Sequence, residues 1–147
     1  MQNFNKKDYQ EYAMRKVPKP TYLKNAILAF LVGGGFCTIA QFIYNFLSSR
    51  GFNDEISSMG SSIFMIFLGS LLTGLGVYDK IGKVGGAGAA VPITGFANSI
   101  VAPAMEFKRE GFIFGVAAKM FIIAGPVLVY GIGSSVIVGI LTILFKG

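Results

Sequence analysis

The sequence lacks histidine and tryptophan, contains a single cysteine, Cys37, and has few charged residues. Transition-metal sites in proteins are built largely from imidazole and thiolate ligands, so we do not expect such a site in this chain. One cysteine cannot form an intramolecular disulfide and therefore indicates nothing about the redox compartment. No Ser/His/Asp set, Cys/His pair or cluster of intramembrane carboxylates is present, so nucleophilic and metal catalysis lack their parts. We expect no enzyme activity, no metal and no cofactor.

Apolar residues dominate the chain instead. Of the 147 residues, 53% are hydrophobic and only 14% are charged, and the mean hydropathy is +0.63. This is far too much apolar surface for a soluble domain. We predict an all-α fold: a polytopic helical protein of the cell membrane with a Gly/Pro-rich re-entrant or broken-helix segment.

Residues 1–24 form a basic arm. Tyr9, Tyr12 and Lys16 have helical spacing, which allows an amphipathic helix on the lipid headgroups; a flexible tail is the equal alternative. Residues 18–20, Pro-Lys-Pro, would end such a helix. The charge suits an anionic lipid surface better than nucleic acid. Membrane lipids are therefore expected partners and nucleic acid is not. The basic residues are Lys6, Lys7, Arg15, Lys16, Lys19 and Lys24.

Residues 25–147 form the predicted membrane domain. About 20 apolar residues at about 1.5 Å each cover a hydrocarbon core of about 30 Å. This length predicts spans at about 26–47 and 60–78, joined by a polar loop at 48–59. The first span is too long for a signal-peptide core, so we expect an uncleaved membrane anchor.

The C-terminal apolar run covers residues 112–145 and is interrupted only by Lys119. As one helix it would be about 51 Å long, which exceeds one hydrocarbon core. Proline removes a backbone hydrogen bond, so Gly125-Pro126 is the expected break. The pattern predicts two pieces, 112–124 and 127–145, which would return the C-terminus to the side of the arm if both cross.

The segment from Gly82 to Pro103 consists largely of Gly and Ala with two prolines and carries no charge after Lys83. In a helix a Gly costs about 1 kcal/mol and a Pro about 3 kcal/mol relative to Ala. Irregular backbone at membrane depth needs protein or a wet cavity around it. If this segment enters the membrane and returns, the basic residues on both sides of it share the cytosolic side with the arm. We therefore predict a re-entrant segment at 84–105.

Small and polar residues form stripes along the predicted spans. In lipid such stripes favour close packing between helices. For the stripe in the first span, which includes Gln41, pore lining is the alternative. The positions expected to pack are Gly34, Thr38, Gly69, Thr73, Gly131, Ser135 and Gly139.

The candidate solute pathway combines the central segment with one intramembrane cation. Pro92 is favoured at the first position of a helix. A half-helix at 91–100 would point free N–H groups and a positive dipole end into the membrane interior, where they can hold an anion. Close packing through the glycines is the equal alternative, and Lys119 either faces the pathway or snorkels to an interface. The candidate pathway residues are Gly88, Pro92, Thr94, Asn98, Ser99, Lys119 and Gln41.

One stretch of the chain carries a family resemblance. Residues 72–82 read Leu-Thr-Gly-Leu-Gly-Val-Tyr-Asp-Lys-Ile-Gly, and residues 86–99 read Gly-Ala-Gly-Ala-Ala-Val-Pro-Ile-Thr-Gly-Phe-Ala-Asn-Ser. Together they closely resemble the stage V sporulation protein AC (SpoVAC) family of spore-forming bacteria. The likeness extends over nearly the whole chain. The related AEb subunit shares the central motif, but the long basic arm is more similar to AC.

The resemblance implies a multi-pass subunit of the spore inner-membrane complex that moves dipicolinic acid, with calcium, into the forespore and releases it at germination. It implies other stage V sporulation A subunits, notably the AEb and AD types, as partners in an oligomer. It also implies a tension-gated channel, and it supplies no catalytic residues. Dipicolinate is a dianion, which fits a lining of helix ends, amide donors and Lys119.

Two functions of different class follow. In the first, the chain is a channel subunit in which Pro92, Asn98 and Lys119 line or gate the path. In the second, it is a non-conducting scaffold that assembles the complex. A neutral residue at Lys119 would alter dipicolinate flux at normal abundance in the first case, and would change only the amount of complex in the second.

The predicted topology can be tested by moving the single thiol of Cys37 to Ser57, Ser99, Lys108 or Lys146 and labelling from one side of sealed vesicles. A re-entrant segment returns to the side from which it started. We therefore expect thiols at Ser57 and Lys108 to react from opposite faces. Labelling of both from the same face would exclude the re-entrant segment.

Overall fold

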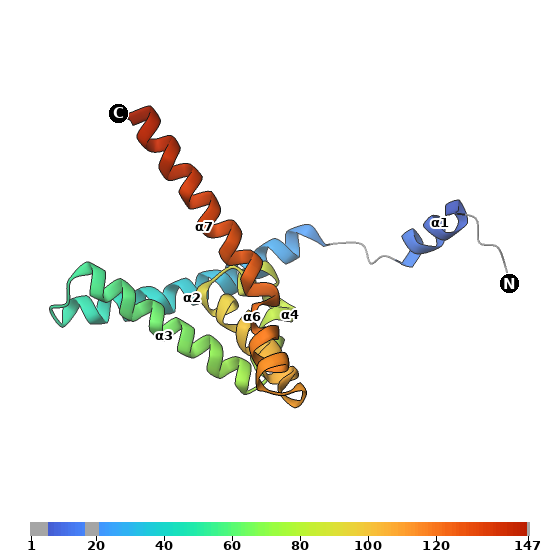
Figure 1. The fold of residues 1–147 in the computed structure, drawn as a ribbon, viewed down its shortest axis with the longest axis horizontal. Coiled ribbons are helices and arrows are strands. Elements are labelled where there is room, and N and C mark those ends of the chain that lie inside the picture. Colours follow the sequence, from blue (N-terminus) through green and yellow to red (C-terminus); the bar gives the residue numbers. More distant parts are fainter. Residues whose placement is uncertain (1–5, 17–20, 147) are drawn as a thin grey trace.

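The computed structural model describes residues 6–16 and 21–146, and the elements in this part of the chain are all helical (Figure 1). The predicted all-α fold is confirmed. The Pro-Lys-Pro elbow at residues 18–20 lies outside the described residues. The elements are α1 (Lys6–Lys16), α2 (Tyr22–Ser49), α3 (Asp54–Gly74), α4 (Tyr78–Gly85), α5 (Ala87–Ala90), α6 (Ile93–Glu106), a 3-10 turn (Lys108–Glu110), a π-helical turn (Phe112–Ala117) and α7 (Ala118–Lys146).

Three helices in the described part of the chain are long and apolar enough to cross a membrane. They are α2, α3 and the continuous helix Phe112–Phe145. This pattern is that of a polytopic helical membrane protein. The basic arm contains the helix α1, in agreement with the amphipathic-helix alternative and not with a flexible tail over these residues. Contact of α1 with lipid stays a prediction.

The second span, α3, begins and ends earlier than the predicted 60–78. The side chain of Asn53 caps its N-terminus by accepting a hydrogen bond from the backbone N–H of Ile56 at 2.8 Å. The carboxylates of Asp54 and Glu55 in the first turn interact favourably with the positive N-terminal end of the helix dipole. After α3, Gly76 adopts a φ of 68°, which ends the helical direction and turns the chain toward α4.

This early start changes the choice of labelling position for the topology experiment. Ser57 lies in the first turn of α3 and is completely buried, not in an open loop. A thiol there would be shielded from the reagent. Arg50 is exposed in the turn between α2 and α3 and reports the same side of the membrane.

The predicted break at Gly125-Pro126 is wrong, because α7 passes through Pro126 as one helix. Proline removes only one backbone donor, and membrane helices tolerate it where neighbouring groups satisfy the freed carbonyl. Residues 112–124 and 127–145 are therefore parts of a single 34-residue candidate span. A helix that crosses once places the C-terminus on the side opposite Lys108.

The central segment, 84–105, folds as the end of α4, the short helix α5 and most of α6. The half-helix predicted at 91–100 corresponds to α6. It begins at Ile93, with Pro92 as an extended N-cap residue, and continues through Pro103 to Glu106. Its re-entry into a membrane stays a prediction.

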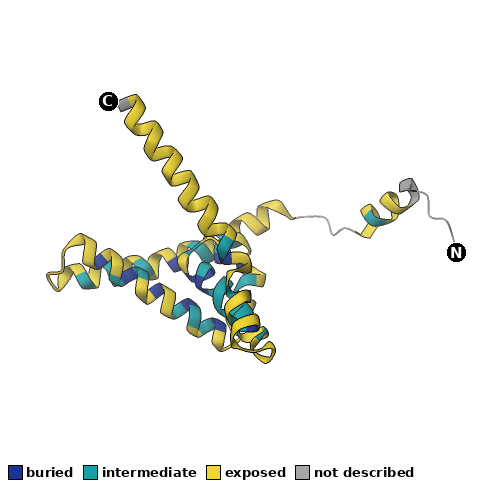
Figure 2. Cartoon of the chain, viewed as in Figure 1, coloured by how far each residue is buried: buried dark blue, intermediate teal, exposed yellow. Residues whose placement is uncertain are grey.

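The buried core lies where α2, α3, α4 and α5 meet. Phe36, Met65, Tyr78 and Ala89 each contribute one buried side chain from one of these helices. The rings of Phe36 and Tyr78 stack with centroids 6.0 Å apart. Figure 2 shows buried positions at this junction and also along α3 where it packs beside α2, and most of the outer surface is exposed. Tyr78 thus begins α4 inside the core instead of closing a span at an interface.

Two glycines set how closely the central segment approaches the spans. A Cβ added at Gly88 would overlap the backbone carbonyl of Ala29 on α2. A Cβ added at Gly69 on α3 would lie 2.7 Å from the carbonyl oxygen of Thr94 on α6. Real Cβ atoms do not come this close to a carbonyl, so backbone meets backbone at both crossings. Glycine is therefore required sterically at both positions.

The last part of α7 projects away from the body formed by α2 to α6 (Figures 1 and 2). Residues 126–145 are all exposed. Gly131, Ser135 and Gly139 lie in this part, and their predicted role in packing between helices has no counterpart within the described chain. Gly34 likewise has open space beside it, whereas the Thr38 hydroxyl donates to the Gly34 carbonyl at 2.8 Å.

We predict that Gly88→Ala lowers the free energy of unfolding by about 1–3 kcal/mol, because overpacking a close contact costs this amount. The added methyl group would push α5 away from Ala29. Gly82→Ala is the matched control, since a Cβ at Gly82 meets nothing within 4 Å. Thermal unfolding of the purified protein in detergent measures both. Equal stability of the two variants would contradict the close approach.

Candidate functional site

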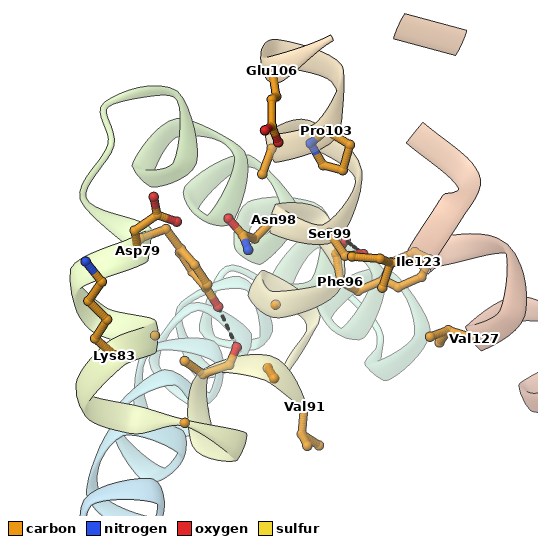
Figure 3. A pocket seen from close by; sticks show the side chains of 17 residues that line it. Asp79, Lys83, Val91, Phe96, Asn98, Ser99, Pro103, Glu106, Ile123 and Val127 are labelled. Atoms are coloured by element: carbon orange, nitrogen blue, oxygen red, sulfur yellow. Dashed lines mark hydrogen bonds between the residues drawn. The ribbon is translucent and has the colours of Figure 1, made fainter. Parts of the chain in front are cut away.

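A cavity of about 910 Å³ opens between α4, α5, α6 and the first half of α7 (Figure 3). In Figure 3 the side chains from α4 face those of α6, and Ile123 and Val127 of α7 lie on the far side. The walls are mainly apolar, with a small number of polar groups. The side chains that define it are Tyr78, Asp79, Lys83, Val91, Phe96, Asn98, Ser99, Pro103, Glu106, Ile123 and Val127.

The cavity exists because the central segment turns twice. Gly86 has a φ of 50° and a ψ of −122°, a conformation that L side chains rarely adopt, and it separates α4 from α5. Pro92 is extended, with a ψ of 165°, and starts α6 in a new direction. Gly95 fits against the carbonyl groups of Ala89 and Ala90, where a Cβ would overlap them. These two turns hold α4 and α6 as separate walls.

The hydroxyl of Tyr78 joins these walls. It lies 2.7 Å from the carbonyl oxygen of Ala89 on α5 and 2.9 Å from the hydroxyl oxygen of Thr94 on α6. A phenol has one proton and a carbonyl can only accept, so Tyr78 donates to Ala89 and Thr94 donates to Tyr78. Thr94 is fully buried. One side chain therefore connects three short helices.

The phenol of Tyr78 stays protonated at neutral pH. Burial raises the pKa of Tyr78 above its ordinary value, and the hydrogen bond with Thr94 opposes part of this rise. Tyr78 lies outside the three candidate spans. The donor to Ala89 is therefore present throughout the physiological pH range.

A second polar contact fixes the wall formed by α6. The Thr73 hydroxyl on α3 lies 2.6 Å from the Gly69 carbonyl oxygen and 2.9 Å from Oδ1 of Asn98. Both oxygens are acceptors and the hydroxyl has one proton, so Thr73 donates to one of them at a time. This contact anchors the Asn98 amide at the edge of the cavity. Because Gly69 permits α3 to approach α6, the packing position and the polar contact depend on each other.

The charges of the cavity lining have a net negative sign. Asp79 and Lys83 come from α4, and Glu106 comes from the end of α6 (Figure 3). Two carboxylates against one ammonium leave one negative charge. Carboxylate oxygens suit hard cations, and apolar walls suit a ring or a hydrocarbon group. The described residues contain no cluster of three or more His, Cys, Asp or Glu that could hold a resident metal ion.

Two of the seven residues predicted for the solute pathway, Asn98 and Ser99, line this cavity. Thr94 lies behind the wall in the Tyr78 network, and Gly88 packs on α2. Pro92 is absent from the lining and acts through the direction it gives α6.

Lys119 and Gln41 lie elsewhere. The ammonium of Lys119 lies 4.5 Å from the ring centroid of Phe107, a favourable cation–π contact. It is half-buried and does not line the cavity. The Gln41 amide donates to Oδ1 of Asn45 at 2.9 Å on an exposed face of α2. Their predicted pathway role stays a prediction.

The candidate pathway predicted from the sequence did not include the cavity residues Tyr78, Asp79, Lys83 and Glu106. A signal was available, because three of them fall in the eight residues before the predicted re-entrant segment at 84–105 and Glu106 follows it directly. A segment that turns back on itself brings its two ends together.

The fold defines a polytopic helical membrane protein with a cavity between its short central helices and the last long helix. The family model described as SpoVAC/SpoVAEB sporulation membrane protein matches residues 25–141. The chain is 43% identical over 142 residues to Stage V sporulation protein AC of Bacillus subtilis (strain 168), and the match covers 96% of this chain and 95% of that protein. The chain therefore belongs to the SpoVAC/SpoVAEB sporulation membrane protein family. No solved structure matches it.

We predict that Tyr78→Phe lowers the free energy of unfolding by about 1–3 kcal/mol, the cost of leaving a buried polar group without a partner. The Ala89 carbonyl would lose its donor and Thr94 would lose its acceptor. Tyr130→Phe is the control, because Tyr130 is exposed. Thermal unfolding in detergent measures the difference. An unchanged midpoint for Tyr78→Phe would rule out the network.

Proposed function

We propose that this chain is a channel subunit of the spore membrane complex that moves dipicolinic acid with calcium, and that the α4 to α7 cavity forms part of the solute path. The cavity is the observation that supports this proposal most directly. Its volume of about 910 Å³ lies within the range of about 300–1,000 Å³ typical of small-molecule sites. Polar groups converge in it from α4 and α6, while α7 supplies an apolar wall.

The charges of the lining favour the calcium chelate over the free dianion. A dianion would meet two carboxylates and one ammonium, which oppose it on balance. In a calcium chelate the bound cation cancels the charge of the solute. Asp79 and Glu106 can then face calcium, while Lys83 faces a carboxylate of the solute. Phe96 offers an aromatic wall for the pyridine ring.

The length of the last helix supports gating by membrane tension. The 34-residue helix would be about 51 Å long, whereas the hydrocarbon core is about 30 Å thick. Such a helix must tilt, and thinning of the bilayer under tension changes the tilt. Ile123 and Val127 belong both to this helix and to the cavity wall. A change of tilt therefore moves one wall of the cavity relative to α4 and α6.

The exposed surfaces support assembly with other subunits. Residues 126–145 expose apolar side chains on all faces, and α2 and α3 are also largely exposed. Lipid covers part of this area, and other stage V sporulation A subunits of the AEb and AD types are the proposed partners for the remainder. The proposed location is the inner membrane of the forespore and spore.

Release of calcium dipicolinate from liposomes that contain the purified chain tests this function. We expect an osmotic down-shift to cause release. The ultraviolet absorbance of the pyridine ring measures the amount released. Glu106→Gln makes the cavity lining neutral. Loss of one charge at contact distance is worth about 1 kcal/mol in water, so the ratio of chelate flux to free-dianion flux should fall about fivefold.

Glu55→Gln is the matched control, because Glu55 is an exposed carboxylate in the first turn of α3 outside the cavity. If Glu106→Gln and Glu55→Gln changed the flux ratio equally, the cavity would not be part of the solute path. The scaffold function would be favoured by two results together. Liposomes with the unaltered chain would release no calcium dipicolinate, and dipicolinate flux in spores would change only in proportion to the amount of complex.

A further inference from the structure

A second, smaller hollow shares Lys83 and Gly86 with the solute cavity and extends to α2. Its volume is about 440 Å³, and it is bounded by the beginning of α2 and by the junction of α4 and α5. Its walls are mostly small residues, Ala26, Ala29, Gly86 and Ala87. A Cβ at Gly86 would meet nothing within 4 Å, so the space in front of this turn is open. A compact group can therefore reach the backbone there.

The polar residues in the lining of this hollow are Lys83 and Asn25. Its described lining contains no carboxylate; Asp79, one turn earlier on α4, lines only the larger cavity. Within the described residues the ammonium of Lys83 makes no ion pair. Oδ1 of Asn25 lies 3.3 Å from the Thr21 hydroxyl that donates to it, which orients the amide nitrogen as a donor for another group. The hollow thus offers one positive charge and amide N–H donors.

The position of the hollow in the fold points to the lipid headgroup layer. Asn25 lies in the first turns of α2, the candidate span Tyr22–Ser49. Tyr22 at its start is exposed, as expected for an aromatic side chain at a membrane interface. Leu23 and Ile27, which lie close to Asn25 and Ala26 along α2, are exposed and apolar, so acyl chains can lie along this helix.

We infer that this hollow binds the phosphate of an anionic phospholipid headgroup. The ammonium of Lys83 neutralises the single charge of a phosphodiester, and the Asn25 amide donates to a phosphate oxygen. The small side chains of Ala26 and Ala87 leave room for the headgroup. A zwitterionic lipid carries its own cation and gains less from Lys83. The site therefore selects anionic lipids.

Binding of fluorescent phosphatidylglycerol to the purified full-length chain in detergent tests this site. A basic residue near an anionic lipid contributes about 1 kcal/mol, so Lys83→Gln should weaken binding about fivefold. Lys80→Gln is the matched control, because it removes the same charge from α4 at a position outside both hollows. It should leave the affinity close to that of the unaltered chain. Fluorescent phosphatidylcholine should bind more weakly and respond to neither substitution.

Lys83 also lines the solute cavity, so two further variants address the small hollow alone. Asn25→Ala removes the amide donor, and Ala26→Leu fills the space without changing any charge. Both should weaken phosphatidylglycerol binding while the helical circular dichroism stays unchanged. Unaltered binding in both, or an equal loss in Lys80→Gln, would overturn the site. Displacement of the lipid by an equal concentration of inorganic phosphate would assign the hollow to free phosphate and overturn the lipid assignment.

Discussion

The hydrogen bond from the Tyr78 hydroxyl to the Ala89 carbonyl, 2.7 Å long, holds the central part of this protein together. The segment around it has little apolar surface of its own, so its backbone cannot be stabilised by side-chain packing alone. Buried carbonyl groups need donors. Tyr78 supplies one donor, accepts from Thr94 and stacks on Phe36, so a single residue joins α2, α4, α5 and α6.

Close backbone contact complements this bond. Gly88 of α5 packs against α2, and Gly69 of α3 packs against α6. At both crossings the helices meet without side chains between them. Dispersion forces are strongest at such separations. The helices α4, α5 and α6 are too short to be stable in isolation, so these crossings and the Tyr78 network are what define their positions. The walls of the cavity are consequently set by contacts outside it.

The sequence was sufficient to predict the all-α class and the presence of helices long and apolar enough to cross a membrane. These features follow from apolar length, which acts locally. Asn98 and Ser99, two of the predicted pathway residues, line the cavity, and their role in a solute path stays a prediction. The break at Gly125-Pro126 was predicted incorrectly, because the loss of one backbone donor does not outweigh the remaining hydrogen bonds of a helix in an apolar environment.

The remaining cavity residues could not be predicted, because they depend on how short helices pack. The turns at Gly86 and Pro92 bring Asp79 and Lys83 into the same cavity lining as Glu106. The spacing of polar and apolar residues in the sequence does not predict this arrangement. Lys119 is a similar case. An intramembrane cation needs a favourable partner. The sequence analysis expected Lys119 to face a solute pathway or the membrane interface, whereas in the structure its ammonium contacts the ring of Phe107.

The place of Pro126 in α7 has a mechanical consequence. Ile123 and Val127, the two residues that α7 contributes to the cavity, lie on either side of it. A helix bends most easily where a backbone hydrogen bond is missing. Flexure of the long apolar rod is therefore concentrated at the level of the cavity, and its outer end can swing through the bilayer while the buried contact at Ala124 acts as the pivot.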